Sequence, residues 1–147
     1  MKKKKKIQIS IILESGIAAA IIVLKLIYYI EKYQHGFFGS FIVFLLWSLI
    51  SISISVFPAI YFITSMFLIY KNADLNRIDY KKIRISFKWT ILNIVFEMVS
   101  VIGGTMSMDS LWIDIAVRMQ ICHIVSFIII IINKKIINDM KRITGNE

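Results

Sequence analysis

The sequence predicts an all-α integral membrane protein, a bundle of four transmembrane helices. Of its 147 residues, 58% are hydrophobic, and the mean hydropathy is +0.74. Several apolar runs reach 18 or more residues, which is rare in a soluble domain of this size. The basic residues fall in blocks between these runs. These three observations predict a single membrane domain over residues 1–147, with no linker, internal repeat or second domain.

The first apolar run covers about residues 7–30 and follows the lysine-rich start MKKKKK. It is longer than the apolar core of a signal peptide, so we expect an uncleaved span. Ser10, Glu14 and Lys25 fall near one face of a helix, because positions eleven residues apart are separated by about three turns. No basic residue is expected at the depth of Glu14. This acid is therefore either a candidate proton or cation site, or a neutral acid hydrogen-bonded near Ser10.

The second apolar run covers about residues 37–58 and continues to residue 70. Pro58, the only proline, is predicted to kink or end the regular span. Residues 59–70 are too few to cross the bilayer again, so they either extend the helix beyond the apolar core or lie in the interface. On a helix, one stripe is predicted to face the other helices, and it contains Ser40, Trp47, Ser48, Ser51, Ser55, Pro58 and Ser65.

The main polar segment is a basic loop over about residues 71–84. A basic residue near an anionic membrane surface contributes about 1 kcal/mol of binding energy. The loop is therefore predicted to rest on lipid headgroups, and a docking site for a protein partner is the alternative. The candidate headgroup contacts are Lys71, Arg77, Lys81, Lys82 and Arg84.

Two further spans are predicted at about residues 85–102 and 111–132. In the third span, Asn93, Glu97, Ser100 and Gly104 share a face. The fourth span is about 33 Å long as a helix, enough for an apolar core of about 30 Å. It nevertheless contains Asp114 and Arg118, which are one helical turn apart and can form an ion pair.

The distribution of basic residues predicts the orientation of the bundle. The amino terminus, the 71–84 loop and the carboxyl-terminal tail hold nearly all of them, whereas the other two connections hold only Lys32. The positive-inside rule then places both termini in the cytoplasm. The lysine-rich start and the frequent use of Ile, Lys and Asn are typical of AT-rich bacterial genomes, so we expect the bacterial cytoplasmic membrane.

Four charged residues are expected to share the outer half of the membrane. One charge at the bilayer centre costs about 2.5–3.5 kcal/mol, so charges there should face inward and pair. Asp114 is expected to pair with Arg118, and Glu97 with Lys25 or Arg118. Such an intramembrane charge network, formed by Lys25, Glu97, Asp114 and Arg118, is either structural or lines a polar cavity that is open to the outside.

The sequence favours a non-enzymatic function. One cysteine, Cys122, and two histidines offer no disulfide and no metal site, and His123 is expected only to form hydrogen bonds in the membrane. No catalytic motif or cofactor site is present, and topology explains the net charge of +9 without nucleic acid. The expected partners are membrane lipids and a membrane protein or peptide.

Three functional interpretations follow. The leading one is a small bacterial immunity or self-protection protein against a membrane-active peptide, or an accessory subunit of a membrane transporter. The first alternative is a small ion- or proton-coupled transporter or channel that uses Glu14 or the outer charge network. The second is a holin-like lytic protein.

Overall fold

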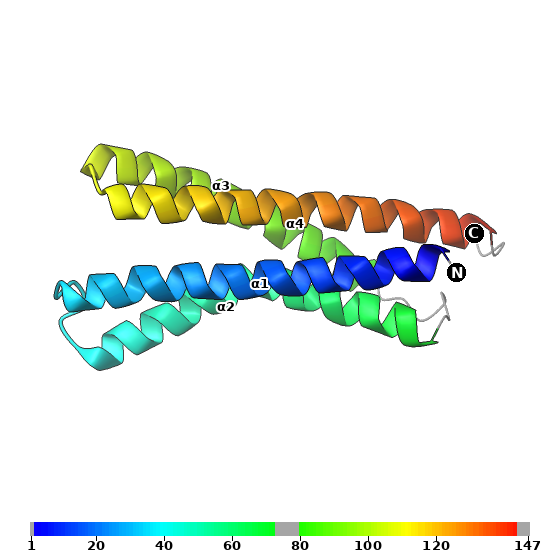
Figure 1. Cartoon of the computed structure of the whole chain (residues 1–147), viewed down its shortest axis with the longest axis horizontal. Helices are drawn as coiled ribbons and strands as arrows, with labels where there is room; N and C mark the ends of the chain where they lie inside the picture. Colours follow the sequence, from blue (N-terminus) through cyan, green and yellow to red (C-terminus); the bar gives the residue numbers. More distant parts are fainter. Residues whose placement is uncertain (1, 73–79, 144–147) are drawn as a thin grey trace.

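Four long helices make up most of the described chain (Figure 1). The structure is a computed structural model that describes residues 2–72 and 80–143, without the side chains of residues 3, 72, 80, 81 and 140–143. Helix α1 packs against α2 and α4, and α3 packs against the same two helices. This arrangement confirms the all-helical, four-helix architecture. The helices are α1 (Lys2–Gln34), α2 (Phe41–Asn72), α3 (Tyr80–Ser107) and α4 (Ser110–Ile143).

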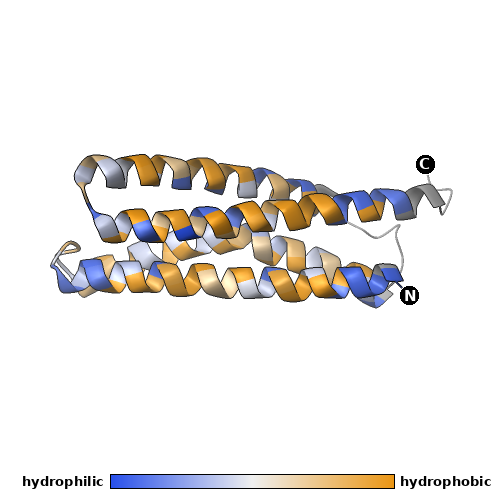
Figure 2. Ribbon diagram, turned by 45° about the horizontal axis from the view of Figure 1, so that its top comes forward, coloured by the Kyte–Doolittle hydropathy of each residue, from blue (hydrophilic) through white to orange (hydrophobic). Residues whose placement is uncertain are grey.

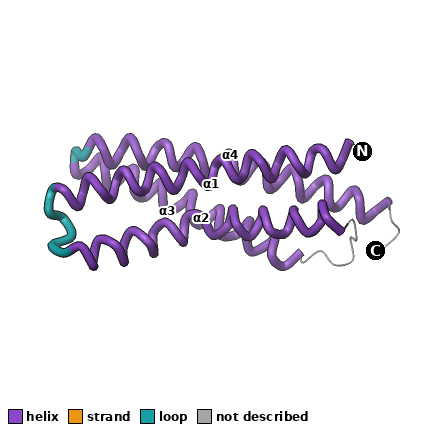
Figure 3. Tube along the Cα trace, turned by 60° about the horizontal axis from the view of Figure 1, so that its bottom comes forward, coloured by secondary structure: helices purple, strands orange, loops and turns teal. Residues whose placement is uncertain are grey.

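The helices run alternately up and down, so the bundle has two distinct ends. Residues 35–40 join α1 to α2, and residues 108–109 join α3 to α4, at the same end (Figure 3). We call this the hairpin end. Helix α1 begins and α4 ends at the opposite end, which we call the terminal end (Figure 1).

All four helices are long and apolar enough to cross a membrane. The shortest, α3, has 28 residues and is therefore about 42 Å long, against an apolar bilayer core of about 30 Å. Hydrophobic residues dominate the middle of the helices, and hydrophilic residues gather toward their ends, most clearly at the terminal end (Figure 2). These four candidate spans fit a multi-pass membrane protein.

Helix α2 continues through Pro58 to Asn72, so residues 59–70 extend the helix. Proline has no N–H to donate to the carbonyl group four residues earlier, here that of Ile54. The side-chain amide of Asn93 on α3 donates to this carbonyl oxygen at 3.3 Å. A neighbouring helix therefore supplies the missing donor, which is how proline is tolerated inside membrane helices.

The described parts of the basic 71–84 segment belong to helix ends. Helix α3 begins at Tyr80, before the expected start of the third span near residue 85. Lys82 and Arg84 consequently lie on the first turns of α3 and not in a loop. Lys71 lies on the last turn of α2.

Local sequence signals explain the connection between α1 and α2. Gly36 has a φ of +75°, a conformation that glycine adopts without steric cost, and its N–H donates to the Tyr33 carbonyl at 2.9 Å. Such a glycine directly after a helix is a common way to end it. Ser40 precedes α2, and its hydroxyl accepts the Val43 N–H at 3.3 Å, as expected of an N-cap serine.

The connection between α3 and α4 is shorter and consists of residues 108–109. Asp109 caps α4 by accepting the Trp112 N–H at 3.0 Å. Helices α3 and α4 approach closely beside it: a Cβ atom on Gly104 would lie 2.9 Å from Cγ1 of Ile113. A larger residue at position 104 would therefore force Ile113 to shift, since real Cβ atoms essentially never approach other atoms so closely.

The apolar core differs between the two halves of the bundle. The core of the terminal half is built mainly from large side chains, namely Ile7, Phe62, Met66, Ile69, Ile83, Ile129, Ile130 and Ile137. The core nearer the hairpin end includes smaller residues and consists of Ala18, Ile21, Val56, Ala59, Ile115 and Met119. Cavities accordingly occur toward the hairpin end.

Candidate functional site

A polar seam joins α1 to α4 in the terminal half. We define it by Ser10 and Glu14 of α1 and by Ser126 and Asn133 of α4. Glu14 is fully buried, and the Ser126 hydroxyl lies 2.9 Å and 3.1 Å from its two carboxyl oxygens. One turn away on α1, the Asn133 amide donates to Ser10 Oγ at 2.8 Å. Each polar group of α1 in the seam thus meets a polar group of α4.

The geometry gives Glu14 a hydrogen-bond partner but no cationic one. The hydrogen-bond partner is Ser126 rather than Ser10, whose own hydroxyl donates to the Lys6 carbonyl at 3.0 Å. Among the residues that the structure describes, no base forms an ion pair with Glu14. A neutral carboxylic acid hydrogen-bonded to Ser126 would fit this environment, because an unpaired carboxylate in apolar surroundings is costly.

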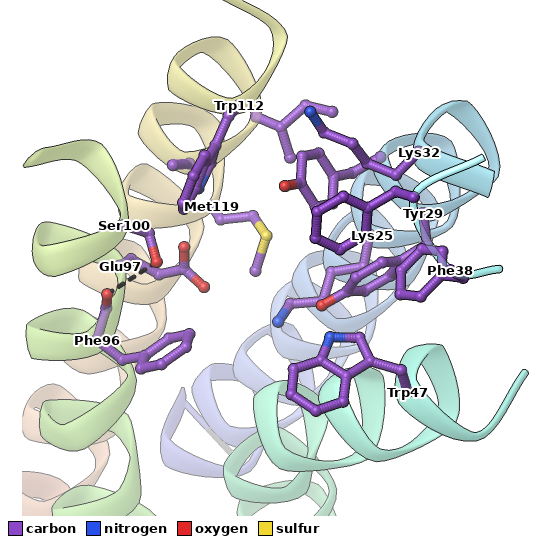
Figure 4. Close-up of a pocket in the computed structure, with 14 residues that line it drawn as sticks. Lys25, Tyr29, Lys32, Phe38, Trp47, Phe96, Glu97, Ser100, Trp112 and Met119 are labelled. Carbon is purple, nitrogen blue, oxygen red and sulfur yellow. Dashed lines mark hydrogen bonds between the residues drawn. The ribbon is translucent and has the colours of Figure 1, made fainter. Parts of the chain in front are cut away.

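A cavity of about 230 Å³ lies near the hairpin end (Figure 4). All four helices and the α1–α2 connection contribute to its wall, so the cavity forms only when the four helices pack together. Half of the lining residues are aromatic, and α1 and α3 contribute charged and polar groups. The lining residues are Lys25, Tyr28, Tyr29, Lys32, Phe37, Phe38, Trp47, Phe96, Glu97, Ser100, Trp112, Ile115, Ala116 and Met119.

Lys25 provides the positive charge of this cavity. It is only 6% exposed, and its ammonium group donates to Ser51 Oγ at 2.7 Å. The Tyr29 hydroxyl donates to the same oxygen at 2.7 Å, which holds the two α1 side chains against α2. An ammonium group has three N–H donors. Two N–H groups of Lys25 therefore remain without a partner among the described residues.

Glu97 provides the negative charge from α3, and it is 4% exposed. Its carboxylate and the ammonium group of Lys25 both point into the cavity from different helices (Figure 4). No described residue forms a direct hydrogen bond or ion pair with this carboxylate. The two charges therefore attract each other across the cavity without closing it. A guest with one anionic and one cationic group would satisfy both.

Asp114 and Arg118 do not belong to this cavity. Arg118 Nε lies 2.9 Å from Asp114 Oδ2, so the ion pair forms along α4. However, the two side chains are 57% and 62% exposed, and neither lines the cavity with Lys25 and Glu97. The inward orientation expected for this pair is therefore wrong. A pair near the end of a helix can neutralise its charges locally and keep contact with the polar interface, which removes the need for burial.

A different ion pair lies beside the cavity. Lys32, which lines it, is hydrogen-bonded to Asp109 in the α3–α4 connection, and their side chains are 22% and 23% exposed. The Lys32 ammonium and then the Trp112 N–H hold the pKa of Asp109 below its ordinary value, because both stabilise the carboxylate. This pair joins the two hairpins at their connections.

The remaining predicted residues have simpler surroundings. Lys71 and Arg84 are exposed, and Lys82 is partly exposed, as headgroup contacts require. Arg77 and the side chain of Lys81 lie outside the described residues. His123 is buried, and its Nε2 has no hydrogen-bond partner in the described part of the chain. In these same ranges, no group of His, Cys, Asp and Glu residues could hold a metal ion.

Sequence reasoning missed several partners of the site residues. Ser51 belongs to the stripe that is predicted to face the other helices, but the sequence does not pair it with Lys25. For Tyr29 the sequence predicts an interfacial aromatic position and not a hydrogen bond to Ser51. Ser126 and Asn133 have no predicted partner. Helical periodicity predicts which residues of one helix share a face, but it does not say which residue of another helix they meet.

Comparison with protein-family models, curated proteins and solved structures finds no match to this chain.

Proposed function

We propose that this chain is a small, non-enzymatic bacterial membrane protein that protects its cell by binding a membrane-active peptide at the hairpin end. In this proposal the hairpin end faces the outside and both termini are cytoplasmic. The positive-inside rule supports this orientation, because the described hairpin connections are poor in basic residues whereas α1 begins with a run of lysines.

The cavity between Lys25 and Glu97 is the observation that carries the proposal. Membrane-active peptides combine apolar and charged side chains, and the cavity offers aromatic walls together with both signs of charge. Aromatic and charged groups that are withdrawn from water are the usual anchors of peptide binding. A purely structural bundle would instead bring the two charges into direct contact, as the Asp114–Arg118 pair does.

Protection can be measured directly in cells. A sensitive bacterial strain that produces the chain should survive at higher concentrations of at least one peptide from a panel of amphipathic membrane-active peptides. Lys25→Met and Glu97→Gln should each remove most of this protection. The matched control is Asp114→Asn with Arg118→Met, which changes a charge pair outside the cavity and should retain protection.

Two results would count against the proposal. Loss of protection in the control variant would show that the cavity charges have no special role. An absence of protection against every peptide, together with loss of a partner transporter's assembly when the gene is deleted, would favour an accessory subunit.

A coupled transporter is the second candidate, and the buried Glu14 favours it. A carboxyl group inside a membrane helix is a typical site for binding a proton or cation. This candidate predicts pH-dependent flux in liposomes that is lost in Glu14→Gln or Glu97→Gln. Flux that is unchanged by both substitutions would exclude it.

A kink of α2 at Pro58 is part of the same proposal. Proline commonly bends membrane helices, and Ile54, the residue with the freed carbonyl, also lines a groove between α2 and α3. Pro58→Ala should straighten α2, which spin-label distances across the helix would detect. Unchanged distances would contradict the kink.

A further inference from the structure

A second, larger cavity adjoins the first. This groove has a volume of about 580 Å³ and lies between α2 and α3. Four residues line both spaces, namely Lys25, Tyr29, Trp47 and Phe96. The charged cavity near the hairpin end therefore lies directly beside the groove.

The groove is apolar and open toward the side of the bundle. On α3 it extends from Val99 to Trp89, a distance of about 15 Å along the helix. This length is about half of the 30 Å apolar core, which corresponds to one leaflet. Ile50, Leu92 and Val99 line it and are between 53% and 61% exposed, so the groove lies on the surface that faces the lipid.

The combined shape and charge match one class of molecule. The groove would accept an acyl chain that points toward the middle of the membrane. The charged cavity lies at the hairpin-end side of the groove, where the headgroup of the same molecule would be. There, the two spare N–H groups of Lys25 suit a phosphate, and the unpaired carboxylate of Glu97 suits an ammonium group.

We propose that the α2–α3 groove and the adjoining cavity bind one zwitterionic phospholipid from the hairpin-end leaflet. Lys25 binds its phosphate, Glu97 binds its ammonium group, and the groove holds one acyl chain. The site would distinguish lipids by the headgroup ammonium, because an anionic lipid with the same phosphate but no ammonium group leaves the carboxylate of Glu97 unpaired. The headgroup would occupy the cavity in the absence of the peptide of the proposed function, so the two guests would compete for Lys25 and Glu97. Lipid retention and protection in cells are separate measurements, so either assignment can fail without the other.

Native mass spectrometry of the full chain in detergent tests the assignment. The probes are phosphatidylethanolamine and phosphatidylglycerol with identical acyl chains. The wild type should retain one phosphatidylethanolamine molecule, with a preference of about tenfold over phosphatidylglycerol, as one charge-assisted hydrogen bond would provide. Equal retention of the two lipids would overturn the proposal.

The two charge variants should fail in different ways. Glu97→Gln should abolish the preference, because only phosphatidylethanolamine carries an ammonium group. Lys25→Met should weaken the binding of both lipids by about tenfold, because both carry a phosphate. The paired control, Asp114→Asn with Arg118→Met, should behave as the wild type. A preference that survives Glu97→Gln would overturn the assignment, even if Lys25→Met fails to fold.

A third variant tests the groove. Val95→Trp would fill the groove from α3, whereas Ile121→Trp places the same side chain on an exposed position of α4 that lines neither cavity. Only Val95→Trp should reduce lipid retention. Soluble glycerophosphoethanolamine, which has no acyl chain, should not displace the lipid. Displacement by this compound, or equal retention in both tryptophan variants, would show that the groove holds no chain.

Discussion

Glu14 and Glu97 are both buried carboxyl groups in candidate membrane spans, but their surroundings differ. Glu14 lies in the terminal half, where large side chains fill the core and Ser126 meets its carboxyl group. Glu97 lies beside a cavity and has no direct hydrogen-bond partner in the described ranges. The comparison suggests that the polar seam stabilises the fold, whereas the cavity keeps polar groups available for a guest.

The largest effect on stability is expected from Ser126→Ala. The carboxyl group of Glu14 would lose its hydrogen-bond partner while remaining buried, which should lower the free energy of unfolding by about 1–2 kcal/mol. The control is Ser100→Ala, because Ser100 lines the cavity and its hydroxyl donates only to the Phe96 carbonyl of its own helix. Unfolding in detergent measures both changes. Equal losses of unfolding free energy in the two variants would show that the seam serine stabilises the fold no more than the cavity serine does.

Asn93→Leu is expected to lower the free energy of unfolding by a smaller amount, about 1 kcal/mol. This substitution removes the donor to the Ile54 carbonyl, which has no backbone partner because of Pro58. Pro58→Ala restores a backbone N–H. In a chain that carries Pro58→Ala, Asn93→Leu should therefore lower the free energy of unfolding by much less. A double-mutant cycle measures this coupling, and strictly additive effects would contradict the explanation.

The ion pair beside the cavity should make stability depend on pH. The pKa of Asp109 in the folded protein lies below its ordinary value of 3.8, so the pair stabilises the fold fully above that pH. This stabilisation is lost as the pH falls through the lowered pKa. Asp109→Asn keeps an N-cap residue but removes the charge, and it should cost about 0.5 kcal/mol at pH 7.

Thermal unfolding between pH 6 and pH 3 measures this dependence. The difference between wild type and Asp109→Asn should shrink toward pH 3. A constant difference over this range would mean that the charge of Asp109 does not contribute.

The smallest effect is expected from Glu97→Gln, which should change the free energy of unfolding by less than about 0.5 kcal/mol. The carboxylate has no direct hydrogen bond to lose, and glutamine has a similar size. The control is Asp114→Asn, which removes one charge of an exposed pair. It should change the free energy of unfolding by a similarly small amount. A loss of 2 kcal/mol or more in Glu97→Gln would show that this residue is structural and would align it with Glu14.

Local patterns in the sequence predicted the helices and their faces. Apolar runs require helices in a membrane, because every backbone group must find a partner within the segment. The shared faces of Glu14 with Lys25 and of Asn93 with Glu97 follow from helical periodicity alone, and all four side chains are buried. The spacing of Asp114 and Arg118 likewise predicted their ion pair.

Only the tertiary structure decided which faces meet. It placed Ser126 against Glu14, joined Lys32 to Asp109, and turned Asp114 and Arg118 away from the cavity. These contacts depend on the rotation and spacing of helices, which are determined by packing between residues far apart in the chain. The cavity between Lys25 and Glu97 exists for the same reason: four helices diverge around it, and no single helix encodes it.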